Sequence, residues 1–583
     1  MGSLAVRGAQ RGLRITSQRS SSYRAPLVAC PASARAYAVQ TRGTPAAKAK
    51  GGRAYRPIAL TSSPHNTFSS SSLSHKASYA SSSSSTAPKT ITVLGQTYET
   101  DDFFNVPPSI LSRLGPRPVL PYQSSHPLEL LRTHIESTLS RCESLAAPSP
   151  IVSAESNFDD LGIAPDHPGR SPTDTYYINR QTCLRTHTSA HEVETFKAGK
   201  TRWLLTADVY RRDEIDASHY PIFHQMEGAS NWSTAPGSTD FDEGGVVQKE
   251  CEEMEARLEG AQIEIEDNVS LEDAGGWQKG HEADPVRRKA AELALRHLKA
   301  TLNGLAYDLF GDRHAAEVAA AAAASQGSTA ESSNDGAASE VSEPLRVRWI
   351  SAFFPFTSPS FEVEVWFRGQ WLEILGCGIS QQSILDRASV QDRVGWAFGL
   401  GLERIAMVLY SIPDIRLFWS KDERFLRQFQ QADQPTRMPK IDSSEAGVSD
   451  AGGNMDQRRK KLVTFRPYSK FPSCHKDVSF WLPKPDLVKD AGSDSSTTEP
   501  VEVASPPSFH ENDLMELIRE TAADLAEDVK LIDSFSHPKT GRVSKCYRIN
   551  YRSMERSLEN EEVNALHDVV VQRVRDELGV EIR

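Results

Sequence analysis

The sequence predicts an α+β protein: an antiparallel sheet flanked by helices, followed by a smaller domain of order βαββαβ. Three observations predict this fold. Alternating strand-like runs occur in pairs joined by turns, amphipathic helices separate them, and a Pro/Gly/Ser/Asp-rich linker spans 431–460. The chain has 583 residues, of which 38% are hydrophobic, so it is long enough for two or more cored domains.

The N-terminal region is basic and rich in serine. It contains 13 basic residues before Glu99, the first acidic residue. This composition is typical of an organelle transit peptide, so residues 1–90 are predicted to be a cleaved leader and a disordered serine-rich spacer. The alternative is a disordered basic tail that binds nucleic acid. No continuous apolar segment near Met1 predicts secretion, and no run approaches the ~20 apolar residues that a membrane helix needs.

The seven cysteines are dispersed, and none forms a C-x-x-C pair. This pattern favours reduced thiols over a disulfide framework or a structural zinc site.

The first ordered elements lie between residues 98 and 309. Residues 126–145 carry apolar side chains at near-helical spacing, and residues 150–230 carry strand-like runs. The acidic segment 233–284 is interpreted as an insertion that is partly helical at best. A helix is predicted at 286–309, and the Ala/Ser-rich residues 312–343 are predicted to be a disordered or marginal excursion.

Strand patterning resumes at Arg346. Alternation in 361–367 places its apolar residues on one face, Arg368-Gly369 predicts a turn, and 371–375 reads as the returning strand. We expect residues 98–430 to form one domain.

Residues 461–583 are predicted to form the second domain, interrupted at about 486–507. Strands are expected at 478–482, 529–536, 543–551 and 580–582, and helices at 512–525 and 560–578. Gly579 suits the left-handed turn that ends the second helix. The order βαββαβ is the ferredoxin-like split.

Chemistry-bearing residues gather on one predicted hairpin, formed by strands 203–213 and 222–227. Alternation places Arg211 and Asp213 on one face with Phe223, Gln225 and Glu227, and it turns His224 and Met226 to the other face. An arginine beside carboxylates, an amide and a ring suits adenylation, in which positioning and positive charge act without a catalytic base. The alternative is an ordinary charged hairpin.

A second group of residues follows at 395–409. Gly399 and Gly401 permit close backbone approach, and Arg404 lies in the first turn of an amphipathic helix. Glu373, on the strand before them, suits ATP directly or through Mg²⁺. The alternatives are a glycine bend with a solvent arginine and a solvated strand glutamate.

Together, the string Val209–Glu227 and the segment Gly395–Arg404 resemble the ATP-binding motifs of class II aminoacyl-tRNA synthetases, and Phe354-Pro355-Phe356 resembles the matching run of the phenylalanine enzymes. The Asp-Ala-Ser-His and Phe-His-Gln-Met-Glu stretches are typical of phenylalanine–tRNA ligases. The resemblance implies that Arg211 and Arg404 are catalytic. The implied ATP-binding residues are Arg211, Asp213, Ser218, His219, Tyr220, Phe223, Glu373 and Arg404, with Glu373 also a metal ligand. Asp213 departs from the family pattern, which has glutamate there.

The same resemblance implies a pocket for L-phenylalanine. Phe354 and Phe356 would pack edge-to-face on the substrate ring, and Ala397 would end the pocket beside Phe398. The remaining implied contacts are His187, Ser189, Ala190, His191, Glu192, Gln225, Met226 and Glu227. An apolar pocket rejects an added hydroxyl by only about a hundredfold, so some tyrosine error is expected.

The terminal domain resembles the anticodon-binding module of phenylalanine–tRNA ligases, and such a module in the same chain is similar to the monomeric mitochondrial form. The implied partner is tRNA(Phe), the implied cofactors are ATP and Mg²⁺, and the implied location is the mitochondrial matrix. Candidate tRNA contacts are Arg458, Arg459, Lys460, Lys461, Phe465, Arg466, Tyr468, Lys470, Phe471, Arg542, Lys545 and Arg548.

Two other functions remain open at this point. One is a non-catalytic synthetase-like protein that binds tRNA, which would be expected to lose an ATP arginine or a pocket residue. The other is an adenylating ligase with a different acceptor, which would need no anticodon module.

Overall fold

The computed structural model describes the greater part of the chain from Lys89 onward. The described ranges are 89–114, 119–146, 148–273, 277, 284–326, 343–420, 422–430, 463–466, 471–483, 509–553 and 556–583. Residues 1–88 of the predicted leader, the linker 431–460, the interruption 486–507 and residues 327–342 of the excursion lie outside the described residues.

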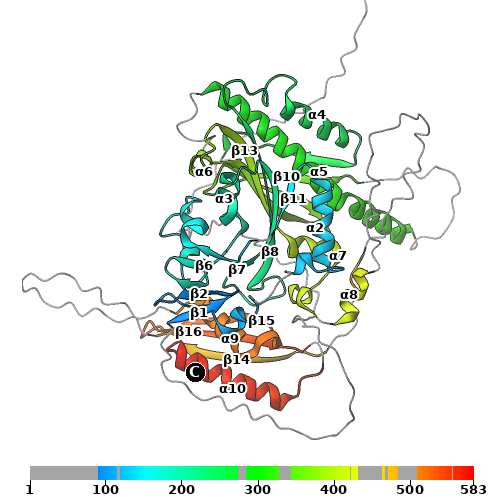
Figure 1. Cartoon of the computed structure of the whole chain (residues 1–583). Helices are drawn as coiled ribbons and strands as arrows, with labels where there is room; N and C mark the ends of the chain where they lie inside the picture. Colours follow the sequence, from blue (N-terminus) through cyan, green and yellow to red (C-terminus); the bar gives the residue numbers. More distant parts are fainter. Residues whose placement is uncertain are drawn as a thin grey trace, which may run out of the picture. The chain divides into compact units, whose positions relative to one another are not determined.

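Eight strands form the main sheet, in the order β3-β7-β8-β13-β12-β11-β10-β9 (Figure 1). Neighbours are antiparallel except at the two edges, where β3–β7 and β10–β9 run parallel. The predicted antiparallel sheet is thus confirmed. The strands are β3 Glu143–Leu145, β7 Arg202–Tyr210, β8 Ile222–Ser233, β9 Ile263–Glu266, β10 Leu345–Ala352, β11 Thr357–Phe367, β12 Gln370–Ser380 and β13 Arg393–Gly401.

Each face of this sheet has its own apolar core, because successive side chains of a strand point to opposite faces. One core includes Met226, Phe398 and Leu400, and the helices α2, α5 and α7 contribute to it (Figure 1). The other includes Leu205 and Ala397, and the helices α3 and α6 cover it. These helices are α2 Pro127–Thr138, α3 Glu192–Lys197, α5 Pro285–Gln326, α6 Gln382–Arg387 and α7 Leu402–Tyr410.

The acidic segment 233–284 is more ordered than its composition suggested. It contains α4 Val246–Leu258 and the edge strand β9. Glu264 and Glu266 of β9 lie within 3.8 and 2.5 Å of the guanidinium of Arg346 on β10. Two acids of this segment therefore pair with the neighbouring strand.

The helix α5 is longer than predicted, because it continues to Gln326 instead of ending near residue 309. The extension runs through an alanine-rich stretch, and alanine has the highest intrinsic helix propensity. The predicted helix 126–145 is shorter than expected, because α2 ends at Thr138 and residues 143–145 form β3.

The C-terminal domain forms a four-stranded sheet in the order β15-β16-β14-β17, with two helices packed on it. Its elements are β14 Cys474–Trp481, α9 Glu511–Ala522, β15 Ala526–Ser536, β16 Val543–Tyr551, α10 Asn560–Glu577 and β17 Glu581–Ile582. The predicted βαββαβ order is confirmed. Gly579 has φ +61°, as the predicted left-handed turn requires.

Short elements complete the described structure. They are β1 Thr90–Val93, β2 Gln96–Glu99, α1 Pro108–Leu111, η1 Leu120–Tyr122, β4 Ile151–Ser153, η2 Glu155–Asp159, η3 Pro168–Arg170, β5 Tyr177–Asn179, β6 Thr182–Leu184, η4 Thr188–His191, η6 Ile415–Trp419, α8 Glu423–Gln430 and η8 Ala523–Leu525.

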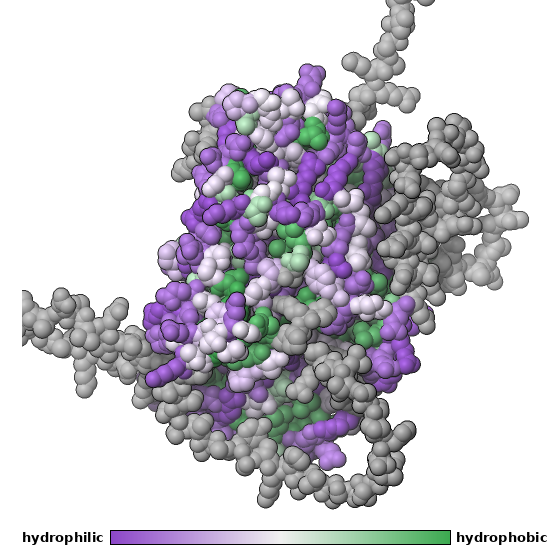
Figure 2. All heavy atoms as spheres, viewed as in Figure 1, coloured by the Kyte–Doolittle hydropathy of each residue, from purple (hydrophilic) through white to green (hydrophobic). Residues whose placement is uncertain are grey.

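The face of the molecule shown in Figure 2 is mostly hydrophilic, with apolar residues in scattered groups. Among the described residues, no helix is long and apolar enough to cross a membrane.

Candidate active site

The two predicted catalytic arginines lie at the same end of neighbouring strands. Arg211 directly follows β7, whose last residue, Tyr210, pairs with the first residue of β8. Arg404 lies in the first turn of α7, which follows β13, and Gly401 at the end of β13 pairs with Gln225 of β8. Because β8 lies between β7 and β13 and runs antiparallel to both, the two arginines lie at the same end of the sheet's central strands.

Arg211 is held by the backbone and by a ring. Its Nε donates to the carbonyl oxygen of Thr186 at 2.8 Å, and its guanidinium carbon lies 5.3 Å from the centre of the Phe223 ring. A planar guanidinium anchored in this way can grip two oxygens of an anion at once. The predicted grouping of Arg211 with Phe223 is present.

Arg404 lies close to a cluster of glutamates. Its Nη1 is 3.7 Å from Glu373 Oε2, and this nitrogen is buried without a hydrogen-bond partner. Burial lowers the pKa of Arg404, while Glu373, Glu364 and Glu362 raise it. Burial also raises the pKa of Glu373 to about 7, against the attraction of Arg404. The hydrogen-bonding capacity of Arg404 and Glu373 is thus only partly used within the protein, as expected for groups that also bind a ligand.

A β-bulge aims Glu373 at this site. The β11–β12 register shifts so that Val363 pairs with Leu375 while Glu364 pairs with Glu373, leaving Ile374 as the extra residue. In a regular strand without the bulge, Glu373 and Leu375 would share a face, and Leu375 belongs to the core under α7. The bulge turns Glu373 to the opposite face, which it shares with Glu364.

Glu403, which had no predicted role, connects the two motifs. Its carboxylate accepts hydrogen bonds from the backbone N–H of His224 at 2.8 Å and lies 2.6 Å from His224 Nδ1. Both side chains are buried, on the helix side of β8, where His224 was predicted to point. Only its position next to Arg404 in the sequence could have drawn attention to it.

The loop between β7 and β8 is organised by Asp216. Its Oδ1 accepts from the backbone N–H groups of Ser218 and His219 at 2.6 and 2.8 Å, and its Oδ2 lies 2.9 Å from His219 Nδ1. Burial disfavours the imidazolium of His219, but its hydrogen bond to Asp216 and the charges of Asp213 and Asp216 raise its pKa to about 9. His219 therefore adds a positive charge to the loop at neutral pH.

Tyr220 has a different environment from its loop neighbours. It is buried, its ring lies 5.5 Å from that of Trp419, and its hydroxyl contacts Arg113 and lies 3.4 Å from Asp524 Oδ1. The structure thus uses Tyr220 for packing and does not place it with Ser218 and His219 on the open part of the loop.

The aromatic pocket residues are buried together on the core face opposite α7. Phe354 and Phe356 stack with ring centres 6.1 Å apart, and Ala397 belongs to the same cluster. Met226 and Phe398 belong to the other core, so the structure does not bring these two to the pocket. Strand alternation explains this, because each directly adjoins a residue that faces the pocket.

Polar groups line the same side of the sheet. The ring of His187 stacks on Phe356 at 6.3 Å, and its Nε2 lies 3.0 Å from the carbonyl oxygen of Asn157. Gln225 Oε1 accepts from the backbone N–H of Thr188 at 3.3 Å. Four buried atoms here have no hydrogen-bond partner: His187 Nδ1, Glu192 Oε2, Gln225 Nε2 and Glu227 Oε2. Unpaired buried polar atoms are costly, so their clustering indicates a polar ligand.

The rest of the predicted substrate loop is divided between two roles. Ser189 and Ala190 are buried in η4, and Ser189 hydrogen-bonds Glu227. His191 belongs to a structural network instead, because its ring nitrogens lie 3.0 Å from Arg185 Nη1 and 2.6 Å from Glu194 Oε1. Arg185 is itself fully buried against Asp208.

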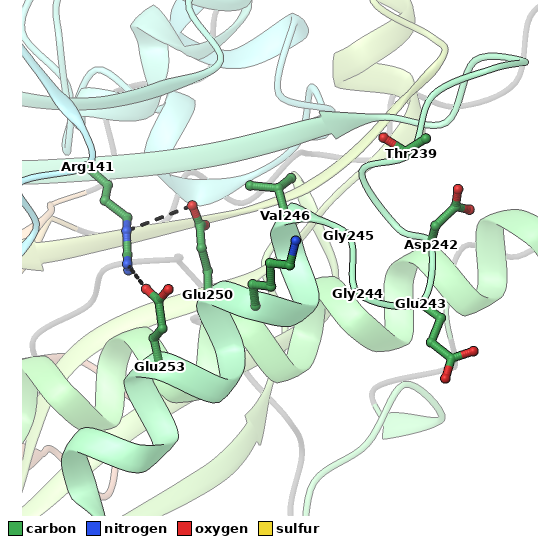
Figure 3. Close-up of a pocket in the computed structure, with 10 residues that line it drawn as sticks. Arg141, Thr239, Asp242, Glu243, Gly244, Gly245, Val246, Glu250 and Glu253 are labelled. Carbon is green, nitrogen blue, oxygen red and sulfur yellow. Dashed lines mark hydrogen bonds and ion pairs between the residues drawn. The ribbon is translucent and has the colours of Figure 1, made fainter.

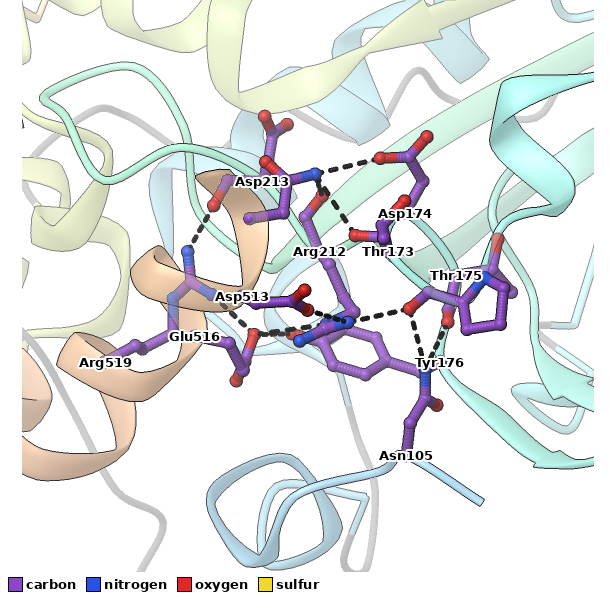
Figure 4. Close-up of polar contacts among 12 residues, drawn as sticks. Asn105, Thr173, Asp174, Thr175, Tyr176, Arg212, Asp213, Asp513, Glu516 and Arg519 are labelled. Atoms are coloured by element: carbon purple, nitrogen blue, oxygen red, sulfur yellow. Dashed lines mark hydrogen bonds and ion pairs between the residues drawn. The ribbon is translucent and has the colours of Figure 1, made fainter. Parts of the chain in front are cut away.

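The segment after Arg211 is tied to helix α9 of the C-terminal domain (Figure 4). Arg212 Nη1 lies 3.1 Å from Asp513 Oδ1, and Arg519 Nη2 donates to the carbonyl oxygen of Asp213 at 2.6 Å. Glu516 accepts from Arg519 at 2.7 Å. The backbone next to Arg211, the first predicted catalytic arginine, is therefore held by contacts from outside its own sheet.

A surface cavity of about 550 Å³ lies elsewhere, at the start of α4 (Figure 3). Its Arg141 already pairs with Glu250 and Glu253, and Lys249 is exposed. It contains none of the predicted site residues.

Comparison with known proteins gives the same two-part organisation. Residues 116–232 and 335–429 match the model of the class II tRNA synthetase core domain, and residues 469–583 match that of the ferredoxin-fold anticodon-binding domain. The second match covers the four-stranded domain whose order was predicted.

The mitochondrial relatives match over nearly their whole length. The mitochondrial phenylalanine–tRNA ligase of Saccharomyces cerevisiae is 40% identical, over 85% of this chain and 95% of that protein. The mitochondrial enzyme of Rattus norvegicus is 37% identical, over 85% and 90%. The phenylalanine–tRNA ligase alpha subunit of Prochlorococcus marinus matches only 47% of this chain, at 29% identity. The chain therefore belongs to the mitochondrial phenylalanine–tRNA ligase family of class II aminoacyl-tRNA synthetases.

Proposed function

We propose that the face bearing Arg211 and Arg404 joins L-phenylalanine to ATP, and that the product, phenylalanyl-adenylate, passes its acyl group to the terminal ribose of tRNA(Phe). The observation that carries this proposal is that both arginines lie at the same end of the central strands β7 and β13, in the sheet that also carries the pocket of Phe354, Phe356 and Ala397.

The first step requires two anions to meet. The carboxylate of phenylalanine attacks the α-phosphorus of ATP, a P–O bond forms, and the bond to pyrophosphate breaks. Arg211 would hold the attacking carboxylate and the α-phosphate together, with adenine stacked on Phe223. Arg404 and the His219 imidazolium would stabilise charge on the leaving pyrophosphate. Fixed positive groups of this kind lower the barrier without a proton transfer.

The donor set near Arg404 fits Mg²⁺. Glu373, Glu364 and Glu362 offer the carboxylate oxygens that Mg²⁺ prefers, and the raised pKa values of Glu373 and Glu362, due first to burial, are what a dication would relieve. When bound, Mg²⁺ would neutralise phosphate charge. Glu214, Asp216 and His219 also lie within 4.8 Å of one another. The imidazolium of His219 makes that group unsuitable for a cation.

For tRNA, the strongest surface is an aromatic and cationic cluster on the C-terminal domain, which we call the Trp481 cluster (Trp481, Phe535, His537, Arg542 and Arg583). The Trp481 and Phe535 ring centres are 6.1 Å apart, and the Arg583 guanidinium lies over both rings, at 5.5 and 5.9 Å. Exposed rings stack on unpaired bases, and arginines reach phosphates.

The predicted basic contacts in this domain are partly neutralised. Lys545 pairs with Glu511 at 2.5 Å and Arg548 with Asp477 at 2.7 Å. Of the other predicted contacts, Phe465 is buried in the core of the main sheet. Arg466 and Phe471 do not belong to that core. The predicted residues at 458–461, 468 and 470 lie outside the described part of the chain.

The names of the curated relatives support a mitochondrial location. We further propose the matrix as the compartment and a monomer as the active form, because one chain matches both the core and the anticodon-binding models.

Phenylalanine-dependent ATP–pyrophosphate exchange by the full chain tests adenylation, and charging of tRNA(Phe) tests transfer. We expect both activities. Arg211→Ala should reduce exchange by about 100-fold or more, since it removes a group that stabilises developing charge. Exchange without charging would point to another acceptor. Absence of exchange with retained tRNA binding would favour a non-catalytic tRNA-binding protein.

A further inference from the structure

Two glutamates from distant parts of the chain are buried beside the predicted amino-acid pocket, and Ser189, three residues before Glu192, hydrogen-bonds Glu227. Glu192 opens α3 and is 0% exposed, while Glu227 lies on β8 and is 2% exposed. The charge of Glu227 acts on Glu192. Each carboxylate has one oxygen, Oε2, without a hydrogen-bond partner.

The contacts that these carboxylates do make come from neutral groups. Glu192 Oε1 accepts from the hydroxyl of Ser380 at 3.4 Å, and Glu227 accepts from Thr188 and Ser189. The nearby amide of Gln225 leaves its Nε2 without a partner. Two buried carboxylates served by hydroxyls alone cannot both remain charged at low cost.

The other ionisable groups around the pocket do not supply the missing positive charge to the pair. Arg185 is committed to Asp208 at 2.5 Å. Burial lowers the pKa of His187 to about 3, and burial also lowers that of His191, so both rings are neutral near pH 7. Arg211 lies beside the Phe223 ring, at the start of β8, where the substrate carboxylate would bind.

We propose that Glu192 and Glu227 hold a proton between them in the empty pocket and form the receptor for the substrate ammonium group, so that phenylalanine binding expels a proton to solvent. This inference rests on the proposed function and adds a second carboxylate and a proton to it. The burial-raised pKa of Glu227, about 7, and the raised pKa of Glu192 agree with it.

The consequence is a pH-dependent affinity with a defined sign. The ammonium group stays charged near pH 7, so its arrival favours the ionised form of both carboxylates and lowers the pKa values of the pair. Proton release should be roughly 0.5–1 per phenylalanine, and the dissociation constant should fall about three- to tenfold per pH unit as pH rises through about 7.

Calorimetric titration of the full chain with L-phenylalanine, in buffers of different ionisation enthalpy near pH 7, counts the released protons. Glu192→Gln keeps the shape and removes one carboxyl, so it should cut the release by at least half while phenylalanine still binds. Glu194→Gln is the matched control. It lies in the same helix with a side chain 66% exposed, and it should leave the count unchanged.

A second ligand keeps the test independent of any variant. 3-Phenylpropanoate has the ring and the carboxylate but no ammonium group, so its binding to the wild-type chain should release no proton. Equal release with both ligands, or no release with phenylalanine, would overturn the inference while leaving the enzyme assignment intact. Failure of the wild-type chain to bind phenylalanine at all would instead count against the proposed function.

Discussion

A single buried carboxylate, Glu403, joins the strand of the first motif to the helix of the second. The carboxylate of Glu403 contacts both the backbone N–H and the ring of His224. Sequence spacing could not predict these contacts, because the two residues are 179 positions apart. Arg404, the next residue, is therefore positioned by a contact on the far side of the sheet from the substrate.

Glu403→Ala should lower the free energy of unfolding by about 2–3 kcal/mol, because it leaves the His224 N–H buried without its charged acceptor. ATP binding should weaken while phenylalanine binding is kept. Denaturant titration and calorimetry measure these effects. Glu423→Ala, at a side chain 76% exposed, should change stability by less than about 0.5 kcal/mol. Equal effects of the two substitutions would contradict the role of Glu403.

His219 predicts an alkaline limit for ATP use. The pKa of His219, about 9, exceeds the ordinary 6.5. Its charge therefore contributes fully to the stability of the folded protein below pH 6.5, and that contribution is lost as pH rises through about 9. The positive charge that it offers to ATP is lost as pH rises through the same value of about 9. At saturating phenylalanine, the KM for ATP should rise above that pH. Asp216→Asn removes the anionic partner and should move the midpoint toward 6.5; an unmoved midpoint would rule out this origin.

At the scale of elements, the close pairing of β8 with β13 depends on a glycine. A Cβ built on Gly395 would lie 2.2 Å from the carbonyl oxygen of Ser230 and 2.6 Å from the Cα of Asn231. Both are backbone atoms, which cannot move aside as a flexible side chain can. The two strands that carry the motifs pair at Gly395 without room for any side chain.

Two glycine-to-alanine substitutions should therefore have opposite effects. Gly395→Ala must push the strands apart and should cost about 1–3 kcal/mol or more. Gly304→Ala in α5 meets nothing within 4 Å and should stabilise the protein by up to about 1 kcal/mol through helix propensity. Thermal or denaturant unfolding of both variants and of the wild type measures the sign of each change in the free energy of unfolding. Destabilisation by Gly304→Ala would show that this helix position is more crowded than described.

At the scale of the whole molecule, adenylation and tRNA recognition use different sheets. The predicted catalytic arginines adjoin strands of the eight-stranded sheet, and the Trp481 cluster lies on the four-stranded one. A change confined to that cluster should separate the two steps of the reaction.

Trp481→Ala should raise the KM for tRNA in charging by roughly 5- to 100-fold, the equivalent of losing one stacked base at about 1–3 kcal/mol. Pyrophosphate exchange should stay at the wild-type level. Trp366→Ala is a useful control, because this tryptophan lies on β11 of the main sheet, away from the cluster, and packs on Trp371. A parallel fall in exchange and charging would place the effect of Trp481 in folding, not in tRNA binding.

The sequence alone determined the motifs, the two-part organisation and most strand faces. Alternation correctly separated Phe223, Gln225 and Glu227 from His224 and Met226, because side-chain direction along a strand is a local property of the backbone. The ferredoxin-like order followed equally from local patterns. Helix length was less predictable, as the alanine-rich end of α5 shows.

Only the tertiary structure decided which distant groups meet. The bulge at Ile374 sets the direction of Glu373, the β9–β10 pairing places two glutamates beside Arg346, and folding buries Glu192 where the charge of Glu227 acts on it. Each of these depends on strand register or on contacts across many residues. Local periodicity carries no information about either, so the charges that share one pocket become visible only once the chain is folded.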